Sequence, residues 1–162
     1  MHRLPPGRWL NAFLRPAAAP TPATRLVADA HHDFRAREPA VSATAAAGFF
    51  TVEAGDPVGA HLMTGTGIRH VPARDGPGHV TGILRLLAHA PRAAAPALAE
   101  TLTSLDATVP DPGVVVVAAD LTAGSALAWE QPLRRLATRH RVLVVQIGDP
   151  RQQALPDPGP PR

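Results

Sequence analysis

Aspartates follow three of the apolar segments that read as strands. Asp29 comes after RLVA, Asp120 after VVVVAA and Asp149 after VLVVQIG, while Asp33 stands four residues beyond the first. In open α/β sheets, ligands bind at the carboxyl ends of neighbouring parallel strands. Carboxylates gathered at such an edge would suit a hard cation such as Mg²⁺. The alternative is that each aspartate only caps the turn or helix that follows it.

Histidines offer a second possible chemistry, because the chain has eight of them. His31, His32 and Asp33 are consecutive, so their side chains diverge unless the loop bends sharply. No HExxH spacing and no third ligand at a zinc-like spacing accompany them. Four of the remaining histidines stand alone on predicted strands or helices, and we expect them to be surface or hydrogen-bonded residues: His61, His70, His79 and His89.

Signatures of catalysis are missing from the sequence. The segment TGTG at 64–67 lacks the frame of a phosphate-binding loop, and there is no GxSxG motif and no cysteine. The serines at 42, 104 and 125 lie in or beside alanine-rich helical sequence. We therefore predict that the protein is not an enzyme. A metal-dependent hydrolase that uses His31, His32 and Asp33 is the weaker alternative.

Apolar patterning predicts the elements that would position these residues. The unbroken run VVVVAAD favours a strand buried on both faces, and we expect 141–149 to be a second buried strand. Residues 31–38 read as a loop. In the helix after it, Val41, Ala45, Phe49 and Val52 are spaced to form the buried face. The predicted elements are strand 25–29, helix 39–54, hairpin strands 58–63 and 68–73, helices 79–90 and 96–109, strand 114–120, a helix within 121–140, and strand 141–149.

This order predicts an α/β fold with a mostly parallel sheet, one antiparallel edge strand, and helices on both faces. The hydrophobic content of 45% over 162 residues is enough for one domain with a core. We expect a Pro/Ala-rich leader at 1–24, the domain at 25–156 and a Pro-rich tail at 157–162. Within the leader, four apolar residues could form a short amphipathic turn: Trp9, Leu10, Phe13 and Leu14. The alternative, which we favour from the sequence, is a loosely docked leader.

Charge and hydropathy exclude several classes of partner. The net charge is +3, and the chain contains arginine but no lysine. Because the arginines are scattered along the sequence, we do not expect nucleic acid as a partner. No segment approaches the ~20 apolar residues of a membrane span. Prolines interrupt the first 20 residues, which argues against a secretory signal. We therefore expect a cytoplasmic location.

Several segments together resemble a known family. They are AGDPVGAHLM (54–63), IRHVPARDGPGHV (68–80), ILRLLAHAP (83–91), VVVVAADLTAG (114–124) and the run at 129–159 that begins WEQPLRRLATRH. In order and content they are similar to the C-terminal, von Willebrand factor A-like half of the bacterial proteins called "domain of unknown function 58". The resemblance implies a Rossmann-like, von Willebrand factor A-type sheet.

Such domains carry a metal-ion-dependent adhesion site, built from a DxSxS loop, a threonine and a later aspartate. The resemblance places Asp29 at the first aspartate and Asp120 at the last. His31 and Asp33 occupy the two serine positions, and the threonine would fall near Pro96, where no hydroxyl occurs. Neutral hydroxyl ligands leave a bound metal positively charged, and a histidine and a carboxylate change both charge and softness. The resemblance thus implies a degenerate site with no metal or weakly bound Mg²⁺.

The function implied is that of a non-enzymatic protein-interaction module. Similar proteins are associated with MoxR-type AAA+ ATPases, so the resemblance implies such a partner. Full-length relatives are membrane-anchored, and no span is present in this chain. The alternative is a scaffold or truncated paralogue with no metal site and no retained activity.

Overall fold

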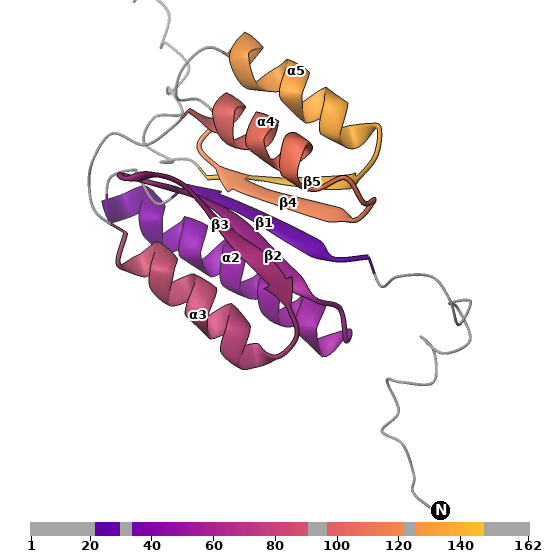
Figure 1. The fold of residues 1–162 in the computed structure, drawn as a ribbon. Helices are drawn as coiled ribbons and strands as arrows, with labels where there is room; N and C mark the ends of the chain where they lie inside the picture. Colours follow the sequence, from indigo (N-terminus) through magenta and orange to yellow (C-terminus); the bar gives the residue numbers. More distant parts are fainter. Residues whose placement is uncertain (1–21, 30–33, 91–96, 122–125, 148–162) are drawn as a thin grey trace, which may run out of the picture.

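A five-stranded sheet in the order β3-β2-β1-β4-β5 organises the part of the chain that the structure describes (Figure 1). The computed structural model describes residues 22–29, 34–90, 97–121 and 126–147. Strands β1 (Thr24–Asp29), β2 (Val58–Thr64), β4 (Val114–Ala119) and β5 (Arg141–Gln146) run parallel, and β3 (Gly67–Arg74) pairs antiparallel with β2. The predicted hairpin and antiparallel edge strand are therefore confirmed.

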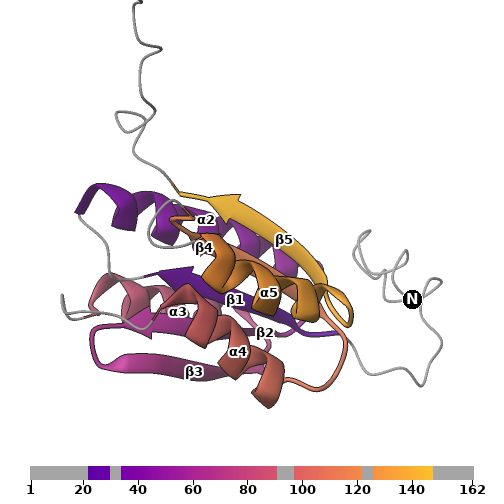
Figure 2. The same ribbon diagram turned by 90° about the horizontal axis from the view of Figure 1, so that it is seen from above.

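Helices cover both faces of the sheet, as Figures 1 and 2 show. Helices α2 (Phe34–Glu53) and α3 (Pro77–Ala88) pack on one face, and α4 (Leu98–Thr108) and α5 (Ala126–Ala137) on the other. The fold class predicted from the sequence is confirmed: a mostly parallel α/β sheet, consistent with a Rossmann-like fold. In the described ranges, none of the helices combines the length and the apolar composition needed to cross a membrane.

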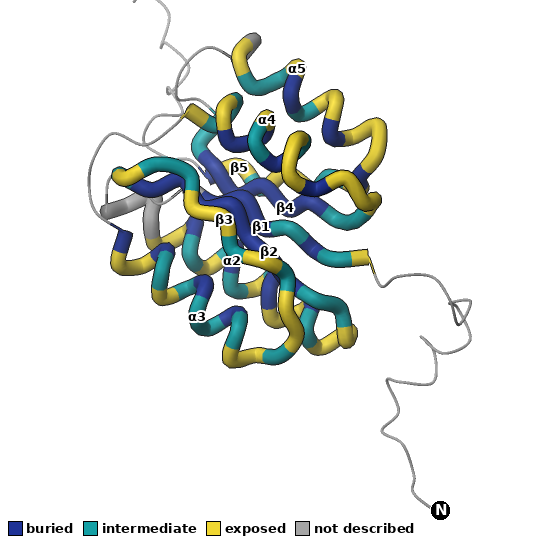
Figure 3. The backbone as a smooth tube through the Cα atoms, viewed as in Figure 1, coloured by how far each residue is buried: buried dark blue, intermediate teal, exposed yellow. Residues whose placement is uncertain are grey.

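The central strands are buried on both faces (Figure 3). In β1, Leu26 belongs to the core under α2 and α3, whereas Val27 belongs to the core under α4 and α5. The valine run of β4 divides in the same way, with Val116 in the first core and Val117 in the second. The predicted burial of this run on both faces is correct, because β4 lies between β1 and β5.

Helix α2 begins earlier than predicted. The loop expected at 31–38 contains helical residues from Phe34 onward, and Pro39 lies inside the helix instead of opening it. Proline lacks an amide hydrogen, so Pro39 deprives the helix of one backbone hydrogen bond near its start. The preference of proline for the first helical turn was therefore a misleading boundary signal here.

The buried face of α2 also differs from the prediction. It consists of Ala40, Thr44, Gly48 and Thr51, while Phe49 is exposed. The hydroxyls of Thr44 and Thr51 donate to the carbonyls four residues earlier, at 2.7 and 2.8 Å, so neither is left unsatisfied. This stripe of small residues lets the helix backbone lie close to its neighbours. Of the four predicted residues, Val41 and Val52 do pack half-buried against the core.

Strand β5 is an edge strand, and the prediction that 141–149 is a buried strand was wrong. It spans six residues, with Leu143 56% and Val144 37% exposed. Within the described residues no strand pairs with its outer side. An apolar run alone does not distinguish a central strand from an edge strand.

We predict that Gly48→Ala destabilises the protein. A Cβ at this position would lie 2.8 Å from Cγ1 of the buried Val80, whose branched side chain has little freedom to move. Overpacking should exceed the gain of about 1 kcal/mol in helix propensity, for a net loss of about 1–2 kcal/mol. Urea unfolding measures it. The matched control is Gly82→Ala in α3, where the added Cβ meets nothing within 4 Å and stability should rise by about 0.5–1 kcal/mol.

Candidate functional site

Two of the predicted site residues lie on neighbouring strands at the same edge of the sheet. Strands β1 and β4 are parallel, with Ala28 paired to Ala118, so the backbones of Asp29 and Asp120 both lie at the carboxyl edge. The chain leaves β1 toward β2 and leaves β4 toward β5, in opposite directions along the sheet. Such a topological switch point is where ligands bind in open α/β sheets.

The structure describes only part of the predicted set of metal ligands. Asp120 is half-buried, whereas His31 and Asp33 lie outside the described residues, as do Asp149 and Pro96. Among the described residues, no group of three or more histidine, aspartate or glutamate side chains is placed to hold a metal ion. The adhesion-site ligand set of Asp29, His31, Asp33 and Asp120 therefore stays a prediction.

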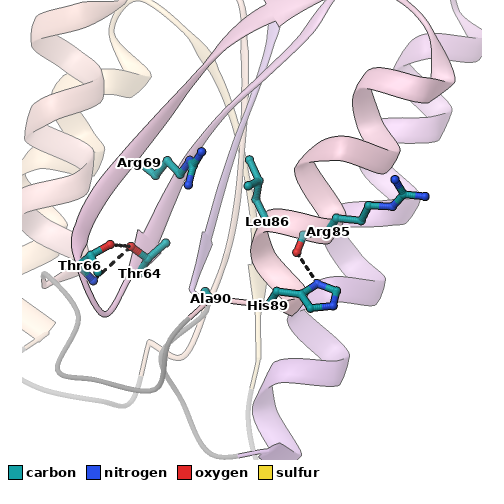
Figure 4. Close-up of a pocket in the computed structure, with 7 residues that line it drawn as sticks. All are labelled: Thr64, Thr66, Arg69, Arg85, Leu86, His89 and Ala90. Atoms are coloured by element: carbon teal, nitrogen blue, oxygen red, sulfur yellow. Dashed lines mark hydrogen bonds between the residues drawn. The ribbon is translucent and has the colours of Figure 1, made fainter.

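A pocket of about 360 Å³ lies beside this edge, and the sequence analysis did not find it. Asp29 pairs with Met63 of β2, and the next residue, Thr64, lines the pocket. Figure 4 shows how the hairpin and α3 form its walls. Its lining residues are Thr64, Thr66, Arg69, Arg85, Leu86, His89 and Ala90.

Hydrogen bonds fix the hairpin wall of this pocket. The buried hydroxyl of Thr64 donates to the carbonyl of Gly67 at 2.8 Å, which closes the turn between β2 and β3. The TGTG segment at 64–67, which lacks the sequence frame of a phosphate-binding loop, forms a hairpin turn, as predicted. The threonines of this turn were a possible sequence signal for the pocket, but the turn sequence does not predict that α3 packs beside it.

The other polar groups of the pocket do not converge. Figure 4 shows the guanidinium of Arg69 directed toward Leu86, whereas the side chain of Arg85 extends away from Arg69. Nδ1 of His89 lies 2.9 Å from the carbonyl oxygen of Arg85, so this nitrogen is the donor. One arginine in this pocket could meet a single carboxylate at the surface, but Arg69 and Arg85 do not converge on one ligand.

His61 forms the second polar cluster, and the expectation of hydrogen-bonded or surface histidines is confirmed for His61, which is hydrogen-bonded, and for His70, which is exposed. The two residues pair across the hairpin, with ring centroids 4.7 Å apart. Nε2 of the fully buried His61 lies 3.1 Å from Oγ1 of Thr108 on α4. Because that hydroxyl donates to the carbonyl of Ser104 at 2.8 Å, His61 must donate to it through Nε2–H.

The pKa of His61 is lowered from its ordinary value to about 4, mainly by burial and to a smaller extent by the nearby His70 and Arg25. The ring is therefore neutral at pH 7. Its role at neutral pH is to fasten β2 to α4, because a neutral imidazole that donates to Thr108 makes a fixed hydrogen bond.

The fold and its edge define the chain as an α/β domain with a candidate binding edge at a topological switch point. The family model described as "Protein of unknown function DUF58" matches residues 28–162, and the chain belongs to this family.

Similar proteins come from mycobacteria. "Uncharacterized protein Mb1516" of Mycobacterium bovis is 36% identical over 126 residues, which cover 76% of this chain and 39% of that protein. "Uncharacterized protein MAV169" of Mycobacterium avium is 36% identical over 92 residues, 55% of this chain and 53% of that protein. The match thus spans about two-fifths of the length of the first relative.

We predict a loss of stability in mild acid that depends on His61. Its pKa is lower in the folded state than the ordinary value of 6.5, so the unfolded chain binds the proton more readily. The contribution is fully present above pH 6.5 and falls as the pH drops toward 4, by about 3 kcal/mol in total. Urea unfolding between pH 7 and pH 4 measures this.

Two variants test whether His61, and not another histidine, causes the loss of stability in acid. His61→Leu should show a clearly smaller loss between pH 7 and pH 4, and His89→Gln, which changes an exposed ring, should keep the full loss. An equal loss in wild type and His61→Leu would contradict the assignment.

Proposed function

We propose that the chain is a non-enzymatic protein-interaction module whose binding edge is the carboxyl edge of β1 and β4. The observation that carries the proposal is the parallel pairing of these strands, which brings the backbones of Asp29 and Asp120 to one edge at the switch point. Two further observations support it: the elements follow the order expected from the sequence resemblance to a von Willebrand factor A-like domain, and a pocket adjoins the same edge.

The chemistry of this edge is that of a degenerate adhesion site. Asp29, Asp33 and Asp120 bring three carboxylates, and His31 brings an imidazole. Three carboxylates more than neutralise a divalent cation, so a bound Mg²⁺ would keep no positive charge with which to attract a carboxylate of the partner. The edge would instead carry negative charge, and it would favour a partner that presents basic side chains.

A MoxR-type AAA+ ATPase is the partner that the family resemblance supports. The competing function is a scaffold or a truncated paralogue that binds neither metal nor partner. The two proposals differ in the expected effect of substituting Asp120. In the interaction module its carboxylate contributes to partner binding, whereas in a scaffold it does not.

The test is the affinity of the purified chain for a purified MoxR-type ATPase from the same genome, measured by interferometry. Asp120→Ala should weaken binding by at least about tenfold, which corresponds to about 1.4 kcal/mol. Asp75→Ala is the matched control, since this exposed aspartate directly follows β3 at the opposite, amino edge of the parallel strands. Circular dichroism establishes that both variants fold. Equal affinities of wild type and Asp120→Ala would reject the binding edge, and a wild type that does not bind would favour the scaffold.

Metal affinity provides a separate prediction. Calorimetric titration with Mg²⁺, Mn²⁺ and Ca²⁺ should show either no heat or a dissociation constant of about 1 mM or weaker, as expected for a site without its hydroxyl ligands. Any weak heat with Mg²⁺ should disappear in Asp29→Ala. Micromolar binding of Mg²⁺ would contradict the degenerate site.

A further inference from the structure

An apolar groove of about 380 Å³ lies at the end of the sheet opposite the proposed binding edge. It runs between the C-terminal half of α2 and the first residues of the parallel strands. Its walls include Ala47 and Phe50 of α2, Val116 of β4 and Leu143 of β5. The volume is within the range of roughly 300–1,000 Å³ that is usual for ligand pockets.

The groove is bordered by apolar side chains that nothing in the described residues covers. Phe50 is 76% exposed and Leu143 is 56% exposed. All the large apolar side chains that are exposed in the described ranges lie on α2 or β5: Phe49, Phe50, Leu143 and Val144. Two of these four, Phe50 and Leu143, line the groove itself, and exposed apolar side chains beside a groove are typical of an interaction site.

The chain itself enters the domain at this groove. Thr24, the first residue of β1, lines it. The amide of Thr24 donates to the carbonyl of Pro57 at 2.9 Å, and the amide of Val114 donates to the carbonyl of Ala23 at 3.3 Å. These bonds hold the start of β1 between β2 and β4, so whatever precedes residue 22 begins at the mouth of the groove.

The sequence before residue 22 contains a segment of matching chemistry. Trp9, Leu10, Phe13 and Leu14 have the spacing that places apolar residues on one side of a helical turn. Arg8 precedes this segment, and the carboxylate-bearing Asp56 lies in the groove wall.

The connecting residues are long enough for the segment to reach the groove. The nine residues from Arg15 to Ala23 extend to about 30 Å at most. The segment that lines the groove, from Ala47 in α2 to Ala54 just after the helix, is only about 10 Å long. A tether of this size keeps the local concentration of the segment in about the millimolar range, so modest affinity is sufficient.

We propose that residues 9–14 bind in the α2–β5 groove of their own chain and cover Phe50 and Leu143. The contact is a cis docking of an aromatic, amphipathic segment onto an apolar surface. It lies at the amino edge of the sheet, so it does not depend on the function proposed for the carboxyl edge.

The fluorescence of Trp9 tests this contact in the full-length chain. The chain has two tryptophans, and Trp129→Phe leaves Trp9 as the sole reporter. In the folded protein, Trp9 emission should be blue-shifted and several-fold less quenched by acrylamide than in 8 M urea (about the concentration of full unfolding). Leu143→Ser and Phe50→Ser in this background should restore the quenching.

The matched control is Val144→Ser on the same strand, because Val144 pairs with Val117 of the α4/α5 core and does not line the groove. This variant should leave Trp9 protected. Circular dichroism establishes folding for each variant. Three results would overturn the proposal: Trp9 as accessible in the folded protein as in urea, protection unchanged in both groove variants, or protection lost on dilution together with sedimentation of a dimer, which would assign the groove to a second copy.

Discussion

The parallel pairing of β1 with β2 on one side and β4 on the other is the constraint on which the rest of the structure depends. It places β1 in the middle of the sheet, where Leu26 and Val27 are buried on opposite faces. Because parallel strands end at a common edge, the same pairing brings the backbones of Asp29 and Asp120 together. The binding role proposed for this edge rests on the direction of these strands.

The helices on the two faces of this sheet differ in the size of the side chains that they pack. Helix α2 approaches through small residues, with Gly48 so close to Val80 that no Cβ fits without movement. Helices α4 and α5 contribute large side chains, among them Leu102 and Leu136. The phenylalanines of α2 are exposed, and Phe50 lines the groove together with Leu143 of β5. The molecule therefore has a polar candidate surface at one end of its strands and an apolar one at the other.

Most of the fold could be predicted because its signals are local. The valine run of β4 and the turn between β2 and β3 can each be recognised from a few consecutive residues. The buried face of α2 could not be predicted, because hydrophobic periodicity favours Phe49, whereas the packing buries Gly48. The edge position of β5 depends on whether another strand pairs with it, and the contact of His61 with His70 depends on hairpin register. At the site, the shared edge of Asp29 and Asp120 was predictable, but the pocket beside Thr64 combines two elements distant in sequence.

The most direct test of the account is an NMR footprint of the isotope-labelled chain during titration with the MoxR-type ATPase. The account predicts that backbone amide signals broaden first at the carboxyl edge, around Asp29, Thr64 and Asp120, while those at the strand starts, Val58 and Val114, stay sharp. Broadening centred on the strand starts, or spectra that remain unchanged at saturating ATPase, would contradict it.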